Sequence, residues 1–225
     1  MNNGPTIQPF RIHDCSLAAI ATGRRAQNLR ELRDHIRDVN ADSLYYHFWG
    51  SRLRPKFDEP VYNNDFASWA HHALRDEIVA ERLSVVDPRD HRTLEGLRQE
   101  LLDIVDFRLD EQEMVPWSKT DEQFSFIRSQ IVVFDTGVSV RTPRELIAAI
   151  PGLSTSSVFY HFIDARRRTS DGRDDFTVWL EAQQGDFAAL VDGLAEVDHY
   201  FVTLSSLRDR ITEVATRWTG VEVTS

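Results

Sequence analysis

The sequence has very little cysteine and very little lysine. Cys15 is the single cysteine among the 225 residues, which excludes an internal disulfide framework and a cysteine-rich zinc site. Lys56 and Lys119 are the two lysines, so arginine supplies nearly all of the positive charge. Because a lone thiol is typical of proteins kept in a reducing compartment, we expect a cytoplasmic protein.

Long apolar runs and an excess of basic charge are also missing. No stretch approaches the roughly 20 apolar residues that span a bilayer. Residues 1–8 have neither the basic start nor the apolar core of a secretory signal. The formal net charge is −10, whereas a dedicated nucleic-acid binder usually presents a basic face. We therefore expect an acidic, soluble protein whose partners include neither a membrane nor a nucleic acid.

Signatures of catalysis and of cofactor binding are absent too. The sequence has no P-loop, no dinucleotide fingerprint and no kinase signature. No Gly-x-Ser-x-Gly elbow surrounds Ser43 or Ser157. No two histidines have the i, i+4 spacing of metal ligands on a helix. These absences predict no cofactor and no metal, and they favour a non-enzymatic protein without excluding an enzyme.

The chain contains an internal repeat. Phe10–Arg54 aligns with Phe124–Arg168 without a gap, and after a short deletion the similarity resumes at Asp65 and Asp175. The identical pairs include Thr22/Thr136, Gly23/Gly137, Glu31/Glu145, Tyr46/Tyr160 and His47/His161. Self-similarity of this length predicts a tandem duplication, in which two copies of one unit are related by pseudo-two-fold symmetry.

The repeat also sets the predicted domain boundaries. We expect a first unit over residues 1–109, a linker over 110–123, a second unit over 124–218 and a C-terminal tail over 219–225. Each unit then has about 100 residues, near the common domain size. The linker is acidic and contains Pro116, while Met114, Val115 and Trp117 indicate that part of it packs against a domain.

Each unit is expected to be mainly helical, with a small β element at its start. Ile131–Phe134 and Val138–Val140 flank a glycine turn and predict a short β-hairpin. The equivalent stretch of the first unit, residues 16–26, fits either a strand or a helix, and we favour the hairpin there too. The predicted fold class is therefore mainly α with a minor α+β character.

Capping residues indicate where helices begin. Thr142, Pro143 and Glu145 have the spacing of a capping box with proline in the first turn, and Asn28 with Glu31 repeats that spacing. Capping explains both glutamates better than a catalytic role does. Further helices of the first unit are predicted at Ser43–Arg54, Asn64–Leu74, Glu77–Val86 and Thr93–Leu109.

The repeated segment Tyr-His-Phe, at residues 46–48 and 160–162, carries the candidate functional histidines. On a helix, a serine four residues earlier and an arginine seven residues later share the face of each histidine. An aspartate at the start of the following helix could then fix the tautomer of the imidazole. The candidate functional or ligand-binding residues are His47, His161, Arg52, Arg166, Arg54, Arg168, Asp65 and Asp175.

A structural role for these residues is the favoured alternative. A histidine between Tyr and Phe is commonly a core residue that is hydrogen-bonded to a neighbouring helix. Asp65 and Asp175 suit the positive end of a helix dipole. The basic run 166–168 is followed by three aspartates, which favours a solvated, self-neutralising loop over a phosphate site.

The ordered segments resemble a known family. They are Thr22-Gly23, Asn28–Leu32, Ser43–Phe48, Asn64–Trp69, Ala80–Leu83 and Thr93–Arg98. This set resembles DUF5752, an uncharacterised prokaryotic family catalogued only as a domain of unknown function. The resemblance covers the first copy well and the second copy partially, because Asp174 replaces the asparagine of the first copy. It implies no activity that could be carried over.

Two hypotheses for function remain. The first is a non-enzymatic module, built from a duplicated helical unit, that binds or regulates a protein partner. The second is an enzyme or a binding protein for a small anionic ligand, which would use the paired histidines and nearby arginines where the repeats meet. Either protein could be a monomer or a homodimer. Buried histidines would favour the first hypothesis, and histidines exposed in a shared pocket would favour the second.

Overall fold

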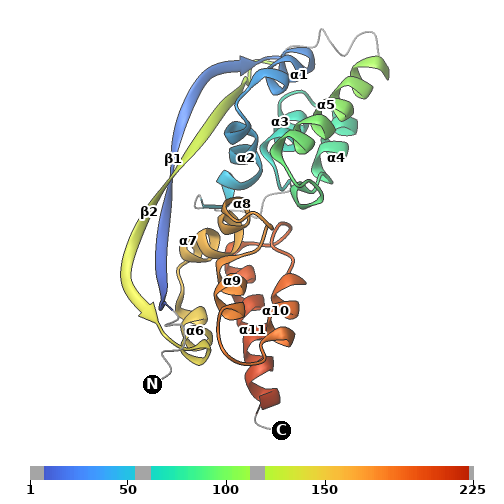
Figure 1. Ribbon diagram of the computed structural model, residues 1–225. Helices are drawn as coiled ribbons and strands as arrows, with labels where there is room; N and C mark the ends of the chain where they lie inside the picture. The colour runs from blue at the N-terminus through green and yellow to red at the C-terminus, as the bar shows by residue number, and fades with distance from the viewer. Residues whose placement is uncertain (1–7, 54–61, 112–119, 223–225) are drawn as a thin grey trace. The chain divides into compact units, whose positions relative to one another are not determined.

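The architecture is mainly helical with one two-stranded sheet. The computed structural model describes residues 8–53, 62–111 and 120–222. Within these residues the strands are β1 (Phe10–Ala26) and β2 (Phe124–Val140), which pair with each other in opposite directions (Figure 1). Helices make up most of the rest. The predicted class, mainly α with a minor β element, is confirmed.

The chain divides into two compact units that do not follow the order of the sequence. Unit 2 comprises Leu17–Ile131, and unit 1 comprises the residues up to Ser16 together with those from Val132 onward. The first part of β1 therefore belongs to unit 1 and the second part to unit 2, whereas β2 is divided in the opposite sense. Each unit thus contains a piece of both strands and one set of helices.

The predicted β-hairpins are wrong. β1 and β2 are each one continuous strand of 17 residues, and neither reverses its direction at the Thr-Gly pair. The strand alternative for residues 16–26 is correct, and the helix alternative is excluded. Each strand finds its partner in the other long strand, far along the sequence, rather than in its own continuation.

The Thr-Gly pair distorts each strand locally without turning it. Gly23 has φ 78°, a value that glycine adopts at little steric cost, and Gly137 has φ 74°. The Thr22 hydroxyl accepts a hydrogen bond from the Arg24 N–H at 3.2 Å and donates one to the Phe126 carbonyl of β2 at 2.7 Å. A left-handed glycine inside a paired strand is typical of a β-bulge. The Thr-Gly pair, which predicted a turn, therefore marks an irregularity within a continuous strand.

The helices of unit 2 occupy the predicted positions. They are α1 (Leu29–Asp38), α2 (Ala41–Trp49), α3 (Asp65–His72), α4 (Glu77–Ser84) and α5 (Leu94–Glu111). A 3-10 turn at Gly50–Leu53 continues α2. Helix α5 packs against α1, α2 and α4, and α3 packs against α4. The buried residues Leu97, Leu101 and Val105 of α5 lie on one face, as the periodicity predicted.

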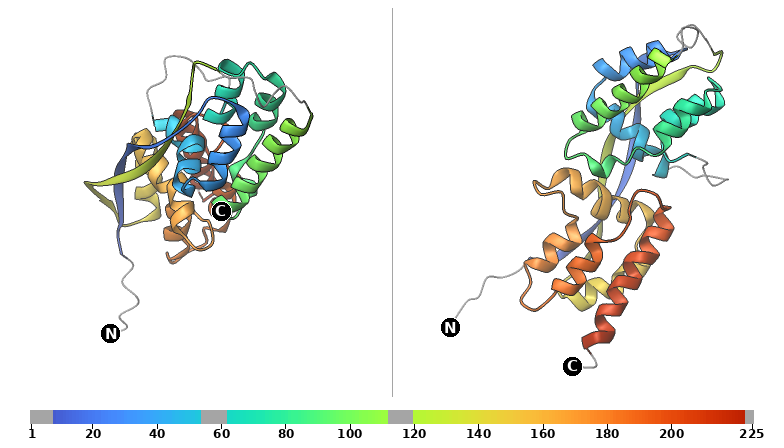
Figure 2. Two further views of the ribbon diagram at one scale, coloured as in Figure 1. Left: turned by 90° about the horizontal axis from the view of Figure 1, so that it is seen from above. Right: turned by 90° about the vertical axis from the view of Figure 1, so that its right-hand side faces the viewer.

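The helices of unit 1 follow a similar order. They are α6 (Pro143–Ala149), α7 (Thr155–Val158), α8 (Ala165–Arg168), α9 (Asp175–Glu181), α10 (Ala188–Ala195) and α11 (Leu204–Glu222). A π-helical stretch, Phe159–Asp164, joins α7 to α8 and contains the Tyr-His-Phe segment. Helix α11 packs against α6, α7 and α10, and Figure 2 shows α10 and α11 side by side.

Both predicted capping boxes are confirmed. The N–H of Glu31 donates to the Asn28 side chain at 2.8 Å, while the Glu31 carboxylate accepts from the Gln27 N–H at 2.8 Å. The N–H of Glu145 donates to the Thr142 hydroxyl at 3.2 Å, while the Glu145 carboxylate accepts from the Arg141 N–H at 2.7 Å. Both glutamates therefore satisfy backbone donors at the start of a helix.

The predicted linker is partly helical. Helix α5 continues to Glu111, so residues 110 and 111 belong to it. The remaining linker features, Met114, Val115, Pro116 and Trp117, lie outside the described residues. At the other end, α11 extends to Glu222 and includes the first residues of the predicted tail.

Candidate functional site

His47 of α2 is buried in unit 2, with only 2% of its surface exposed. Its Nδ1 lies 2.9 Å from the Asp65 carboxylate at the start of α3. Its Nε2 accepts a hydrogen bond from the backbone N–H of Ile127 in β2 at 3.2 Å. Both ring nitrogens are therefore bonded to atoms of the protein itself.

His161 of unit 1 repeats this arrangement with different partners. It is also 2% exposed. Its Nδ1 lies 2.8 Å from the Asp175 carboxylate at the start of α9, and its Nε2 accepts from the backbone N–H of His13 in β1 at 2.9 Å. The strand that supplies the N–H group is thus β2 in unit 2 and β1 in unit 1.

These contacts assign one tautomer to both rings. A backbone N–H can only donate, so the Nε2 atom that faces it carries a lone pair and no proton. The single proton of the neutral ring then lies on Nδ1, where it is donated to the aspartate. Asp65 and Asp175 consequently fix the orientation of the imidazoles, as expected from the spacing.

A serine completes each arrangement. The Ser43 hydroxyl donates to the carbonyl of Ile127 at 2.7 Å, and the Ser157 hydroxyl donates to the carbonyl of His13 at 2.8 Å. Serine and histidine, four residues apart on one helical face, therefore bind both backbone groups of one strand residue. We call each set of serine, histidine and aspartate a histidine clamp: Ser43, His47 and Asp65 in unit 2, and Ser157, His161 and Asp175 in unit 1.

Aromatic side chains enclose both clamps. The ring of His47 lies 4.6 Å from that of Phe124 and 5.2 Å from that of Phe66, measured between centroids. The ring of His161 lies 4.9 Å from that of Phe10 and 5.7 Å from that of Phe176. Such packing excludes water from the imidazoles and strengthens their hydrogen bonds.

Of the candidate arginines, Arg168 lies nearest to a clamp. Its guanidinium donates to Asp175 at 3.0 Å and to Asp164 at 3.0 Å, and it stacks over the ring of Tyr160 at 4.1 Å. Asp175 is therefore shared between His161 and an arginine. The structure thus brings His161, Asp175 and Arg168 together, as the sequence predicted.

The other candidate arginines lie elsewhere or outside the described chain. Arg166 pairs with Asp174 at 3.1 Å and lies over the ring of Phe162. Arg52 lies over the ring of Trp49 at 5.4 Å. Arg54 falls outside the described residues. The basic run 166–168 is helical, in α8, and not a loop, although its arginines do pair with nearby carboxylates.

Two buried aspartates of unit 1 pair with arginines. Asp164 was missed from the sequence, whereas Asp174 was expected from it as a helix N-cap and does cap α9. Asp164 is 1% exposed and pairs with Arg167 at 3.2 Å and with Arg168 at 3.0 Å. Asp174 is also 1% exposed, and its burial raises its carboxyl pKa, although Arg166 acts against this shift. For Asp164, the neighbouring arginines at 166–168 were the available signal, because buried carboxylates are usually paired.

The described residues contain no group of three or more histidine, cysteine, aspartate or glutamate side chains placed to hold a metal ion. In the same part of the chain, none of the helices combines the length and apolar character needed to cross a membrane.

What the clamps can do chemically is limited by their geometry. Each histidine orients and binds backbone groups, and neither ring presents a nitrogen to a substrate.

Comparison with known proteins gives a fold relative and a family. No curated protein matches the chain. The solved structure described as "The structure of OrfY from Thermoproteus tenax" is similar over 96% of this chain and 97% of that chain, with a TM-score of 0.80 and 26% sequence identity. The model of a family of unknown function, DUF5752, matches residues 7–216. Since this match spans nearly the whole sequence, the chain belongs to the DUF5752 family.

Proposed function

We propose that the protein is a non-enzymatic module that binds or regulates a protein partner, and that its histidine clamps serve as structural fasteners. The observation that carries this proposal is that both nitrogens of each imidazole already take part in hydrogen bonds within the protein. Each ring is 2% exposed, and each of its nitrogens is bonded to the chain. A catalytic or ligand-binding histidine needs a nitrogen within reach of the substrate.

Exposed apolar side chains support binding to a protein. In unit 1, β2 exposes 41% of Val132, 50% of Phe134 and 51% of Val138. In unit 2, Phe107 of α5 is 58% exposed. Large apolar side chains that remain in contact with water frequently mark interaction surfaces.

We further propose that the two units arose by tandem duplication and retain pseudo-two-fold symmetry. Matching contacts in the two units support the duplication. Besides the clamps, the indole of Trp69 donates to the carbonyl of Glu122 at 2.7 Å, and that of Trp179 donates to the carbonyl of Gln8 at 2.9 Å. In both cases a tryptophan of the helix that begins with the clamp aspartate binds the chain just before a strand.

A small anionic ligand remains the alternative. Arg168 favours it, because this arginine is 36% exposed while it holds the clamp aspartate. An anion bound there would compete with Asp175 for the guanidinium. We prefer the fastener role because Arg168 already has two carboxylate partners.

The experiment that tests the fastener role is a thermal melt of His47→Gln and His161→Gln, singly and together. A glutamine can place an oxygen near the position of Nε2, but it has no counterpart of the Nδ1–H group. Asp65 or Asp175 then loses a buried donor, which costs about 1–3 kcal/mol. For a chain of this size, we expect each single variant to melt roughly 2–12 °C lower.

Two controls separate the alternatives. His72→Gln, at an exposed position of α3, should leave the melting temperature unchanged. Addition of phosphate or citrate should not raise the melting temperature of the parent protein. Clamp variants that melt like the parent, together with an anion-dependent rise that Arg168→Gln abolishes, would establish the ligand-binding alternative instead.

A further inference from the structure

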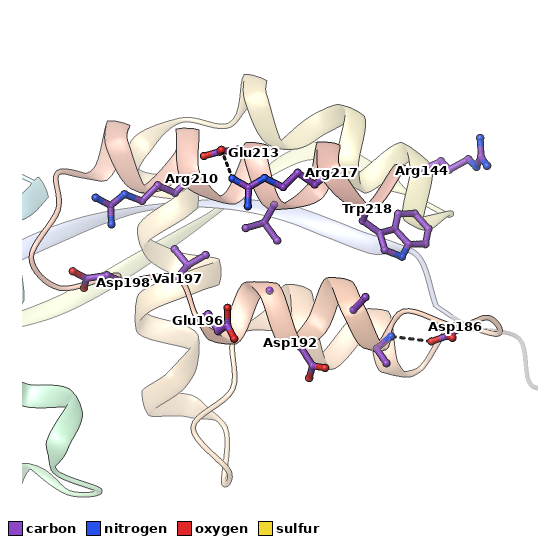
Figure 3. A pocket seen from close by; sticks show the side chains of 14 residues that line it. Arg144, Asp186, Asp192, Glu196, Val197, Asp198, Arg210, Glu213, Arg217 and Trp218 are labelled. Atoms are coloured by element: carbon purple, nitrogen blue, oxygen red, sulfur yellow. Dashed lines mark hydrogen bonds and ion pairs between the residues drawn. The ribbon is translucent and has the colours of Figure 1, made fainter. Parts of the chain in front are cut away.

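Unit 1 contains a groove between α10 and α11 that the clamps do not use. Its volume is about 1260 Å³, which exceeds the roughly 300–1,000 Å³ of a small-molecule site. Its lining includes the small apolar side chains of Ala189, Val197 and Val214 and the backbone of Gly193, and Trp218 lies at one end (Figure 3). The part of α11 from Arg210 to Trp218 is about 12 Å long, which matches two turns of a helix.

Charge is distributed unequally over the two walls of the groove. The α10 side carries Asp192 and Glu196, whose carboxylates form no hydrogen bond or ion pair with any described residue. The α11 side carries Arg210 and Arg217, and Arg217 is bonded to Glu213 (Figure 3). Arg144 of α6 also lines the groove. The α10 wall therefore presents unneutralised negative charge beside an apolar floor.

In unit 2, the helices that correspond to α10 and α11 are α4 and α5, and an arginine side chain lies between them. In α4, Arg82 precedes the buried Leu83, as Gly193 precedes the buried Leu194 in α10. The guanidinium of Arg82 lies 4.8 Å from the centre of the Phe107 ring of α5 and donates to Glu111 at 2.8 and 2.9 Å. Unit 2 thus joins its two helices with an arginine that contacts both an aromatic ring and a carboxylate.

Unit 1 lacks that arginine and the charge pair beside it. Gly193 has no side chain, and a Cβ atom there would lie 2.8 Å from a methyl group of Val214. In unit 2, the buried Arg108 of α5 pairs with Asp76, at the start of α4, at 2.9 Å. In unit 1, the start of α10 has Phe187, whose ring lies 5.3 Å from that of Trp218. The groove therefore retains carboxylates and an aromatic ring but has no cation of its own on the α10 side.

We propose that this groove binds a basic amphipathic helix of a partner protein. Small apolar residues of that helix would lie on Ala189, Gly193 and Val214, while its arginine or lysine side chains pair with Asp192 and Glu196. A cation placed over Trp218 would make the contact that Arg82 makes with Phe107 in unit 2. This inference rests on the proposed protein-binding function and names the surface and the chemistry of the partner.

The test uses a synthetic helical peptide of about 15 residues, near the shortest length that is helical in isolation. Its alanine and leucine residues form one stripe, and arginines flank that stripe. A second peptide has the same composition in an order that breaks the stripe. Binding to the full chain is measured by calorimetry at about 0.15 M salt, which screens long-range attraction. We expect the striped peptide to bind and the scrambled peptide to bind at least tenfold more weakly.

Charge-reversal variants locate the binding surface. Asp192→Lys changes an exposed residue of α10, and Glu196→Lys changes the exposed residue that caps its C-terminus; each should weaken binding of the striped peptide about tenfold or more. Glu81→Lys is the matched control, because Glu81 precedes Arg82 in α4 as Asp192 precedes Gly193 in α10. This control should leave the dissociation constant unchanged, and the melting temperatures of all variants should equal that of the parent.

Four results would overturn the inference. Equal binding of both peptides, or equal weakening by Glu81→Lys, would mean that net charge alone attracts the peptide. Binding that survives both α10 variants would exclude this groove and leave the proposed protein-binding function intact. Absence of peptide binding, together with an anion-dependent rise in melting temperature that Arg168→Gln abolishes, would remove both proposals.

Discussion

At the scale of single residues, the clamps substitute side chains for a neighbouring strand. The N–H and C=O groups of one residue in a strand point to the same side, where an adjacent strand would normally bond both. At Ile127 these groups are bound instead by His47 and Ser43 of a helix. A histidine in its Nδ1–H tautomer and a serine hydroxyl supply one acceptor and one donor, which is the pair that a strand edge requires.

Cys15 offers a test of how firmly β1 is held in unit 1. Burial, followed by the nearby charge of Asp14, raises the pKa of its thiol to about 12, so that the thiolate is negligible at neutral pH. We expect no reaction with an aromatic disulfide reagent at pH 8 in the native protein and rapid, stoichiometric reaction in urea. Labelling of the native protein at the unfolded rate would mean that this part of β1 leaves the unit readily.

Asp174 gives a prediction for pH dependence. Because burial raises its pKa in the folded protein, the unfolded chain releases this proton first as the pH increases above the ordinary value of 3.8. Its contribution to stability therefore decreases as the pH rises through that window. Asp174→Asn removes the titration and keeps the helix cap, since Asn64 caps α3 in the same way. Urea unfolding should show the variant gaining stability relative to the parent from pH 4 upward, and a constant difference would contradict this.

At the scale of elements, the long strands depend on a glycine that distorts them locally. No atom lies within 4 Å of a Cβ placed on Gly137, so an alanine there meets only the strain of its positive φ. That strain is about 1–2 kcal/mol. We expect Gly137→Ala to lower the free energy of unfolding by this amount in urea titrations. Gly152→Ala, which also enters open space but has no positive φ, is the control and should change stability little.

The helices and their caps could be predicted from sequence because the forces behind them are local. Asn28 and Glu31 lie one turn apart, and their bonds close within that turn. The pairing of His47 with Asp65 also followed from spacing. The partner of each strand could not be predicted, because it lies about 100 residues away and sequence spacing says nothing about it. The alternation at Phe124 and Phe126 was the missed signal that β2 begins at Phe124 and not at the predicted Ile131.

At the scale of the whole molecule, the compact units and the sequence repeats make different predictions for fragments. Residues 17–131 contain α1 to α5 together with the part of β2 that the His47 clamp binds. Residues 1–109 lack Phe124, Phe126 and Ile127, which surround and bind that histidine. We expect the 17–131 fragment to unfold cooperatively in circular dichroism melts and the 1–109 fragment to give no cooperative transition. Cooperative melting of the 1–109 fragment would show that the repeat folds without the exchanged strand.

The divided strands also determine the order in which a newly made chain can fold. Residues 10–16 leave the ribosome before any of the described helices, yet the helices that bind them begin only at Pro143. Synthesis proceeds at about 5–20 residues per second, so on the order of ten seconds pass before the helices that bind the beginning of β1 have been made. Unit 2 can close during that interval, because all of it has emerged once Ile131 has left the ribosome. Translation therefore favours completion of unit 2 before unit 1, so that residues 10–16 are among the last to be packed.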